Sequence, residues 1–307
     1  MGGIHPRVKE AIKAIELDRE RGASQLAQGA LETLRLAVEE SEAETLSEFL
    51  REVREAGREL ARARPSMAPL LNSVGKAVYL IEENSGRLSL EELKSFASSK
   101  IDGLILESKA SLRKIAGLAS KVLKGKTVVT HSFSSTAVEA IKTARAKRAI
   151  VSESRPLLEG RRTAAELSRS GIPTALVVDA ALGLFAPKAD VALVGCDSIL
   201  ADGSVVNKVG TYALGLIARD NGLPFYAAAE TLKIDPRSLS GGGVELEEMD
   251  PGEVAGGLPN VEVKNVYFDV TPSRLITGII TEKGILKPSE VEAYAREYAR
   301  YARALPL

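Results

Sequence analysis

The first part of the chain has the hydrophobic spacing of amphipathic helices. Within residues 46–53, apolar side chains fall at positions i, i+3, i+4 and i+7, which places one apolar stripe on a helix. The sequence SLEE at residues 89–92 is a capping box, so another helix is expected to start there and run into the 110s. No convincing strand precedes residue 125. We therefore predict a helical N-terminal domain over residues 1–122.

After Gly125 the pattern changes to short, β-rich apolar runs that are separated by helix-like segments. The runs are Val128–Val129, Ile150–Val151, Leu176–Val178, Val191–Val194, Phe225–Ala229 and Val266–Phe268. Alternating buried strands and helices imply a parallel sheet covered on both faces. The sequence therefore predicts an α/β protein whose second domain, over residues 123–307, is of the doubly wound class.

Composition and charge exclude several classes of function. Forty-one basic and 41 acidic residues cancel, which argues against direct binding of nucleic acid, because neutralising phosphates needs an excess of Lys and Arg. No apolar run approaches the roughly 18 residues that span a bilayer, and the N-terminus lacks a signal-peptide core. We therefore expect a cytoplasmic protein that does not bind membranes. The single cysteine, Cys196, excludes an intramolecular disulfide and a thiolate-rich metal site.

Polar side chains follow the ends of the predicted strands, which is where open parallel sheets bind their ligands. These positions are Thr130–Ser132, Glu153–Arg155, Asp179, Gly195–Asp197, Glu230 and Asp269. Capping of a helix is an equally good explanation for Asp179 and Asp269.

The densest polar group lies in residues 195–218, where Asn207 and Lys208 come at the start of a predicted helix. The free N–H groups and partial positive charge of a helix N-terminus favour an anion, and Lys208 would add a full charge. A solvated surface lysine is the alternative for Lys208, and likewise for Lys233, which comes just past another strand.

The turn THSFSS at residues 130–135 has the same strand–turn–helix order, and Ser134 or Ser135 could simply cap its helix. Ser132 beside His131 suggests a nucleophile and its base, but adjacent residues rarely point at each other and no G-x-S-x-G elbow surrounds them. A hydrolase is therefore disfavoured. His131 is a poor metal ligand, because no second His or Cys lies at ligand spacing. Neither a G-x-G-x-x-G nor a Walker A loop follows a strand, and we expect neither metal nor cofactor.

Several stretches together resemble one known family. They are THSFSS, ESRPLLEGRRTAAEL, VGCDSILADGSVVNKVGTYALGLIARDNGLPFYAAAETLKI and FDVTPSRLITGIITEKGIL, with RGAS at 21–24 and ARPSMAPLLNS at 63–73. The family holds the alpha, beta and delta subunits of translation initiation factor 2B, methylthioribose-1-phosphate isomerase and archaeal ribose-1,5-bisphosphate isomerase. The resemblance implies a helical N-terminal domain, a Rossmann-like C-terminal domain, and a homodimer or larger assembly formed through the latter.

Resemblance to this family leaves the activity open, because it contains both enzymes and non-enzymes. Its isomerases convert an aldose 1-phosphate to a ketose 1-phosphate with a cysteine in a THC turn and an aspartate in a GAD turn. Carried over by position, the aspartate is Asp197, whereas Ser132 replaces the cysteine; Cys196 stands where the family usually has alanine. A serine hydroxyl is far less acidic than a thiol and needs a dedicated base, so the resemblance implies at best a poor isomerase.

The ligand-binding positions of the family are kept. The positions that the resemblance assigns to the surroundings of the sugar phosphate are Arg21, Gly22, Ala23, Arg64, Ser134, Ser135, Asn207, Lys208 and Lys233, to which we add His131 and Arg155 from the strand ends. Arg21 and Arg64 can grip phosphate with planar donor forks.

We therefore expect a subunit resembling those of initiation factor 2B, which binds a phosphorylated sugar or nucleoside monophosphate without turnover. Subunits of initiation factor 2 are its candidate protein partners. One alternative is an aldose–ketose isomerase acting on ribose 1,5-bisphosphate or methylthioribose 1-phosphate, with Asp197 as acid and base and a hydroxyl or water replacing the thiol. Another is an oligomeric scaffold with a vestigial pocket.

Overall fold

The computed structural model describes residues 4–18, 21–65, 67–241, 248–256 and 258–305. It divides into two compact units: Met1–Ala110 with Leu232–Gly242 and Ala293–Leu307, and Ser111–Thr231 with Gly243–Glu292. Both units are discontinuous along the chain. The domain boundary expected between residues 122 and 123 rests on the change in sequence pattern, and it stays a prediction. No helix of the described part of the chain is both long and apolar enough to cross a bilayer.

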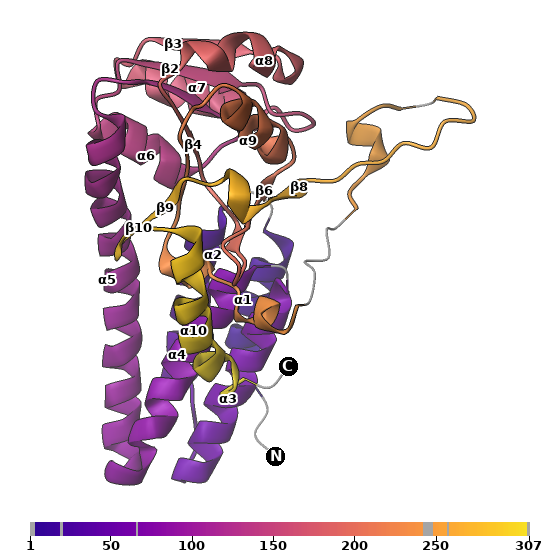
Figure 1. The fold of residues 1–307 in the computed structure, drawn as a ribbon. Helices are drawn as coiled ribbons and strands as arrows, with labels where there is room; N and C mark the ends of the chain where they lie inside the picture. The colour runs from indigo at the N-terminus through magenta and orange to yellow at the C-terminus, as the bar shows by residue number, and fades with distance from the viewer. Residues whose placement is uncertain (1–3, 19–20, 66, 242–247, 257, 306–307) are drawn as a thin grey trace. The chain divides into compact units, whose positions relative to one another are not determined.

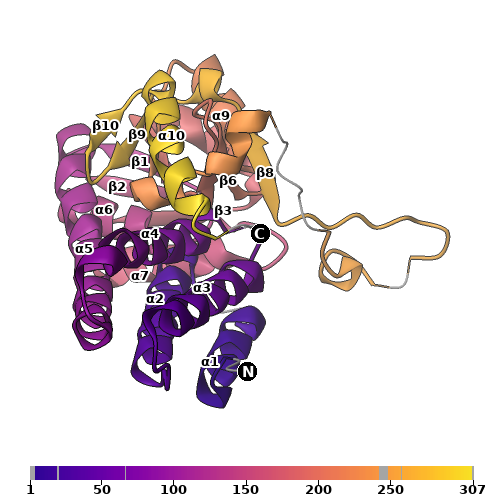
Figure 2. The same cartoon turned by 90° about the horizontal axis from the view of Figure 1, so that it is seen from below.

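The first unit is built from helices. They are α1 (Pro6–Leu17), α2 (Ala23–Glu39), α3 (Leu46–Ala63), α4 (Ala68–Asn84), the first part of α5 (Leu90–Leu123) and most of α10 (Val291–Ala302). The unit also contains 3-10 turns at Ser85–Arg87 and Pro236–Ser240 and the last two residues of the turn Thr231–Lys233. The apolar stripe predicted within α3 is confirmed, since Phe49 and Val53 are buried in the core of this unit. Helix α2 packs against α3 and α4 (Figure 2).

Local capping explains where two of these helices begin. The Ser89 hydroxyl and backbone N–H donate to the Glu92 carboxylate at 2.7 and 2.9 Å, which confirms the predicted capping box at the start of α5. The same reciprocal arrangement joins Thr45 and Glu48 at the start of α3.

Helix α4 approaches the C-terminal helix closely at Gly75, where a Cβ would fall 2.8 Å from the Tyr301 carbonyl oxygen.

The second unit contains a seven-stranded sheet of order β10-β9-β7-β4-β1-β2-β3 (Figure 1). Its strands are β1 (Thr127–Thr130), β2 (Arg148–Ser152), β3 (Thr174–Val177), β4 (Val191–Val194), β7 (Phe225–Ala228), β9 (Gly278–Thr281) and β10 (Gly284–Leu286). All neighbours are parallel except β10, which runs antiparallel to β9. The mostly parallel sheet confirms the predicted α/β class.

Helices and short turns connect these strands. They are α6 (Ser135–Thr143), α7 (Glu159–Arg169), α8 (Leu182–Phe185) and α9 (Thr211–Asp220), with 3-10 turns at Asp179–Ala181, Ala186–Lys188, Pro251–Glu253, Ser273–Leu275 and Pro288–Glu290. The chain moves from β1 through β2 to β3 on one side and then returns to β4 on the other. The topological switch point therefore lies between β1 and β4, and the residues after these two strands are the expected ligand-binding position.

A second, antiparallel sheet of order β5-β6-β8 accounts for two differences from the sequence prediction. It consists of β5 (Ser198–Ile199), β6 (Val205–Lys208) and β8 (Phe268–Thr271). The run at 266–268 does not supply a parallel strand, because Phe268 pairs antiparallel with Lys208. Asn207 and Lys208 end a strand and do not begin a helix, since pairing with β8 holds them extended.

Candidate functional site

His131, the residue after β1, is a buried structural bridge. Its Nδ1 lies 2.5 Å from Ser152 Oγ and its Nε2 lies 2.8 Å from the Val209 carbonyl oxygen, and only 2% of the residue is exposed. Because a carbonyl can only accept, we assign the ring proton to Nε2, and Nδ1 accepts from the Ser152 hydroxyl. Burial lowers the pKa of His131, which favours this neutral form. Both ring nitrogens are therefore engaged away from Ser132.

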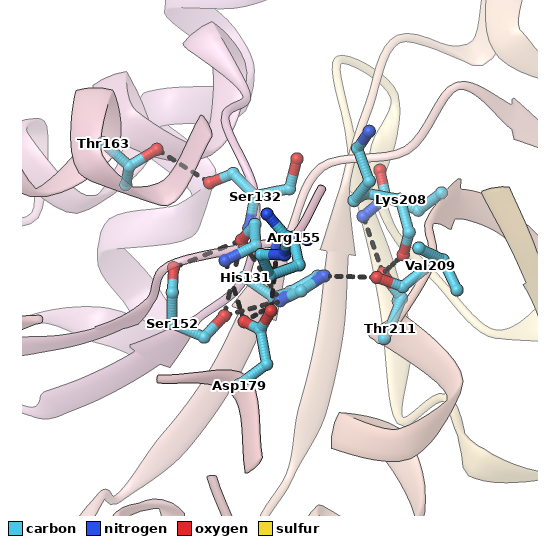
Figure 3. Close-up of polar contacts among 12 residues, drawn as sticks. His131, Ser132, Ser152, Arg155, Thr163, Asp179, Lys208, Val209 and Thr211 are labelled. Carbon is cyan, nitrogen blue, oxygen red and sulfur yellow. Dashed lines mark hydrogen bonds and ion pairs between the residues drawn. The ribbon is translucent and has the colours of Figure 1, made fainter. Parts of the chain in front are cut away.

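Ser132 has an unusual backbone that its neighbours hold in place. Its φ of 66° is in the left-handed region, which non-glycine residues seldom adopt. The Ser132 N–H donates to Ser154 Oγ at 2.7 Å, and its carbonyl accepts from Thr163 Oγ1 at 2.7 Å. In Figure 3 the Ser132 side chain extends away from the His131 ring. Among the described residues nothing forms a hydrogen bond with the Ser132 hydroxyl, so the turn lacks a base that could activate it.

The turn after β2 is tied down by Asp179. The Asp179 carboxylate accepts from the backbone N–H groups of Ser154 and Arg155, each at 2.8 Å. Asp179 thus shapes this loop and caps no helix of the described residues, and a role in ligand binding stays a prediction. The exposed Arg155 guanidinium donates to the carbonyls of Val254 and Glu253 at 2.9 and 3.4 Å.

Asp269 caps helix α9 from a neighbouring strand. Its carboxylate accepts from the N–H groups of Gly210 at 2.7 Å and Tyr212 at 3.1 Å. Capping, one of the two roles expected for Asp269, is therefore confirmed, although the helix belongs to another part of the chain. The N–H groups expected to face an anion at this helix N-terminus thus donate to the Asp269 carboxylate, whereas anion binding by Lys208 stays a prediction.

Lys208 places a buried positive charge within the second unit. It is only 4% exposed, and its Nζ lies 3.1 Å from Glu159 Oε1 and 4.2 Å from the centre of the Tyr267 ring. The alternative of a solvated surface lysine is therefore wrong for Lys208. Asn207 beside it donates from Nδ2 to Thr211 Oγ1 at 2.9 Å, which fixes the turn into α9.

Glu159 is a site residue that the sequence reasoning missed. It is the first residue of α7, and Gly160 behind it lets the helix approach β2 so closely that a Cβ would fall 1.7 Å from the Ser152 carbonyl oxygen. Burial raises the pKa of Glu159; the Lys208 charge opposes this rise and the Asp197 charge adds to it. The only feature of the sequence that pointed to Glu159 was its position in the ESRPLLEGRR stretch, which lies between β2 and β3.

Asp197 and the THSFSS turn meet at the switch point. Asp197 follows β4, is partly buried, and donates its N–H to the Val206 carbonyl at 2.9 Å. Its neighbour Gly195 contacts the turn, since a Cβ there would fall 2.3 Å from Ser134 Oγ. Ser134 caps α6 by accepting from the Ala137 N–H at 3.3 Å, and Ser135 is the first helical residue. The second unit thus brings Ser134, Asp197 and Lys208 to one end of its sheet.

The remaining predicted residues belong to the first unit. Arg21 Nε donates to Asp18 Oδ2 at 2.6 Å, and Arg64 Nη1 donates to the Asp18 carbonyl at 2.7 Å, so the two arginines converge on one residue. Gly22 and Ala23 follow Arg21 at the start of α2.

Lys233 lies in a segment that Asn72 holds. The Asn72 side-chain amide donates to the carbonyls of Leu232 and Ile234, the two neighbours of Lys233, at 2.7 and 2.6 Å. Lys233 is 6% exposed, so a solvated surface position is wrong for it as well. The sequence did not single out Asn72, although it lies in the quoted ARPSMAPLLNS stretch.

Comparisons with known proteins place the chain in one family. The model of the Initiation factor 2 subunit family matches residues 19–288. The chain is 38% identical over 287 residues to a putative translation initiation factor eIF-2B subunit 2-like protein of Pyrococcus horikoshii, covering 92% of this chain and 97% of that one. It is 33% identical over 306 residues to ribose 1,5-bisphosphate isomerase of Haloferax volcanii, covering 96% and 93%.

Two solved structures from Pyrococcus horikoshii have similar folds. Translation initiation factor eIF-2B matches with a TM-score of 0.76 and 36% identity, over 93% of this chain and 98% of that one. Methylthioribose 1-phosphate isomerase matches with a TM-score of 0.75 and 29% identity, over 95% and 87%. The relatives therefore include both initiation-factor-like proteins and sugar-phosphate isomerases.

Proposed function

This chain belongs to the Initiation factor 2 subunit family, as its motifs suggested, and we propose that it binds a phosphorylated sugar or nucleoside monophosphate without turning it over. The observation that carries the proposal is the contrast between Lys208 and Ser132. A buried cation is retained at the end of the sheet, whereas the position assigned to the proton-transferring thiol holds a serine whose hydroxyl forms no hydrogen bond with any described residue and whose side chain extends away from the His131 ring (Figure 3).

The absence of turnover follows from acidity. Moving a proton between two carbons of a sugar needs a group whose pKa lies near the working pH. A thiol starts near 8.5 and is easily tuned, whereas a serine hydroxyl stays protonated unless a neighbouring base accepts its proton. The obvious base, His131, has its two ring nitrogens engaged by Ser152 and Val209. Ser132 is therefore a poor substitute for the thiol.

Ligand binding is supported by the groups that converge at the switch point of the second unit. The charge of Lys208 and the N-terminus of α6, capped by Ser134, both favour an anion beside Asp197. Arg21, Arg64 and Lys233 belong to the first unit, and the family resemblance alone assigns them a role in ligand binding.

Calorimetric titration with ribose 1-phosphate, ribose 1,5-bisphosphate and AMP tests the binding. We expect one of these ligands to bind, and Lys208→Ala to weaken its affinity at least tenfold, because a charged hydrogen bond is lost. Lys142→Ala is the matched control, since Lys142 pairs with Glu139 on the surface of α6. Absence of binding by all three compounds would remove the proposal.

A second candidate function, aldose–ketose isomerisation, is favoured by a different observation. Burial and, to a smaller extent, the Asp197 charge raise the pKa of Glu159, and a raised carboxyl pKa suits proton transfer. Relatives named ribose 1,5-bisphosphate isomerase add weight to this candidate. Incubation with ribose 1,5-bisphosphate or methylthioribose 1-phosphate, followed by NMR, decides between the two. Ketose formation by the wild type that Asp197→Asn abolishes would establish the isomerase.

We also propose a cytoplasmic homodimer or larger assembly, formed through the second domain, that contacts initiation factor 2 subunits. The support is the family and the similarity to the initiation-factor-like protein of Pyrococcus horikoshii. Light scattering after size-exclusion chromatography measures the assembly. A pull-down with purified initiation factor 2 subunits tests the partner, and a monomer that retains none of them contradicts both statements.

A further inference from the structure

The ammonium group of Lys208 is already neutralised by its surroundings. Glu159 Oε1 lies 3.1 Å from Lys208 Nζ, and the Tyr267 ring covers it at 4.2 Å. The Tyr267 hydroxyl donates to the Glu253 carboxylate at 2.6 Å, so this ring is held in place. An anion that approaches Lys208 must therefore compete with the Glu159 carboxylate for the same charge.

The other carboxylate oxygen of Glu159, Oε2, lacks a hydrogen-bond donor within the described part of the chain. Glu159 Oε2 is buried, and among the described residues it accepts no hydrogen bond. A buried acceptor without a donor lowers stability, because it has lost its hydrogen bonds to water and no protein hydrogen bond replaces them. A ligand hydroxyl that donates to Oε2 would remove this cost. The same carboxylate thus repels an anion and attracts a hydroxyl group.

The charges that face Glu159 make the repulsion strong. Lys208 approaches from β6, Asp197 from the turn after β4, and Glu159 itself begins α7. These three side chains comprise two carboxylates and one ammonium group, so a bare dianion would add to an excess of negative charge. Protonating Glu159 removes part of that excess, and burial has already raised the pKa of Glu159.

We propose that Glu159 determines the specificity of this site: it prevents bare anions from binding at Lys208 and admits phosphorylated ligands that carry hydroxyl groups. A sugar phosphate offers Lys208 an acceptor and offers Glu159 Oε2 a donor, and it therefore binds while Glu159 is ionised. Sulfate offers only the acceptor, and it binds when Glu159 takes up a proton. The inference rests on the proposed function in one respect, namely that the ligand contacts Lys208.

The test measures sulfate and ribose 1-phosphate binding by calorimetry at pH 5.5 and pH 8, for the wild type and Glu159→Gln. Sulfate suits the purpose because it remains a dianion over this range. We expect the wild type to bind sulfate at least tenfold more weakly at pH 8 than at pH 5.5. Glu159→Gln should bind sulfate equally well at both values and at least tenfold more tightly than the wild type at pH 8, and it should lose affinity for ribose 1-phosphate.

Two further variants keep the outcome clear. Glu166→Gln removes the same charge from the same helix, where Glu166 pairs with the exposed Arg162, and it should behave like the wild type. Glu159→Asp keeps the charge and should still exclude sulfate, which gives a readout even if the glutamine variant folds poorly. Equal sulfate affinities of the wild type and Glu159→Gln at pH 8 would overturn the inference. Failure of the proposed function would show differently, as a wild type that binds none of ribose 1-phosphate, ribose 1,5-bisphosphate and AMP.

Discussion

The imidazole of His131 lies against the bare α-carbon of Gly210, where a Cβ would fall 2.9 Å from both Cε1 and Nε2 of the ring. Gly210 has a φ of 106°, and its N–H donates to Asp269. Because His131 also bridges Ser152 and Val209, this contact holds the turn after β1 beside the turn into α9. The position of Lys208, two residues before Gly210, depends on the same packing.

Replacing Gly210 with alanine should destabilise the protein through backbone strain and through a clash with the His131 ring. We expect a loss of about 2–3 kcal/mol in the free energy of unfolding, measured by urea denaturation. Gly222→Ala is the matched control, since Gly222 also has a positive φ, of 65°, but a Cβ there would meet no atom within 4 Å. Equal losses in the two variants would show that the histidine contact adds nothing.

The lowered pKa of His131 predicts a specific loss of stability in mild acid. The unfolded chain takes up a proton near pH 6.5, whereas burial keeps the folded ring neutral to a lower pH. Stability should therefore fall as the pH drops below about 6.5, by up to about 1.4 kcal/mol per pH unit for this one group. Urea denaturation of the wild type and His131→Gln between pH 5 and pH 8 isolates the effect, because other titrating groups are common to both. Parallel curves would contradict it.

Asp269 should stabilise α9 although it lies far from that helix in sequence. Its carboxylate accepts from the N–H groups of Gly210 and Tyr212, so Asp269→Ala leaves two donors of the helix N-terminus without their acceptor. We expect a loss of about 1–2 kcal/mol, in the range of a lost N-cap, measured by chemical denaturation. Asp269→Asn keeps one acceptor oxygen and should lose less. A larger loss for asparagine than for alanine would be inconsistent with capping.

Features that depend on neighbouring residues were predictable from the sequence. The capping box of Ser89 and Glu92, the Ser134 cap and most strands of the parallel sheet follow from local spacing. Strand β6 was not predicted, because the extended conformation of Lys208 depends on pairing with Phe268. The same long-range pairing brings Asp269 opposite Asn207, next to α9, which is how its side chain comes to occupy a helix N-terminus expected to be free.

In the candidate site, too, contacts between distant parts of the chain could not be predicted from the sequence. Ser132, Asp197 and Lys208 were found because they match motifs of a family, and the structure adds what no motif encodes, namely the groups that touch them. Glu159 became visible only through its ion pair with Lys208. Asn72 became visible only through the two carbonyls that it bonds beside Lys233. Both partnerships join distant parts of the chain, so neither has a signature in spacing or composition.

Placing a cysteine at position 132 tests directly the proposal that Ser132 prevents turnover. The backbone at this position is held by Ser154 and Thr163, so Ser132→Cys should place a thiol where the hydroxyl now lies. We expect this variant to convert ribose 1,5-bisphosphate to its ketose at least a hundredfold faster than the wild type, because a positioned acid–base group contributes about 10²–10⁴ in rate. Phosphorus NMR follows the reaction. Ser132→Ala should remain inactive, and adding Asp197→Asn to Ser132→Cys should abolish the gain; a wild type that already matches the cysteine variant would contradict the proposal of binding without turnover.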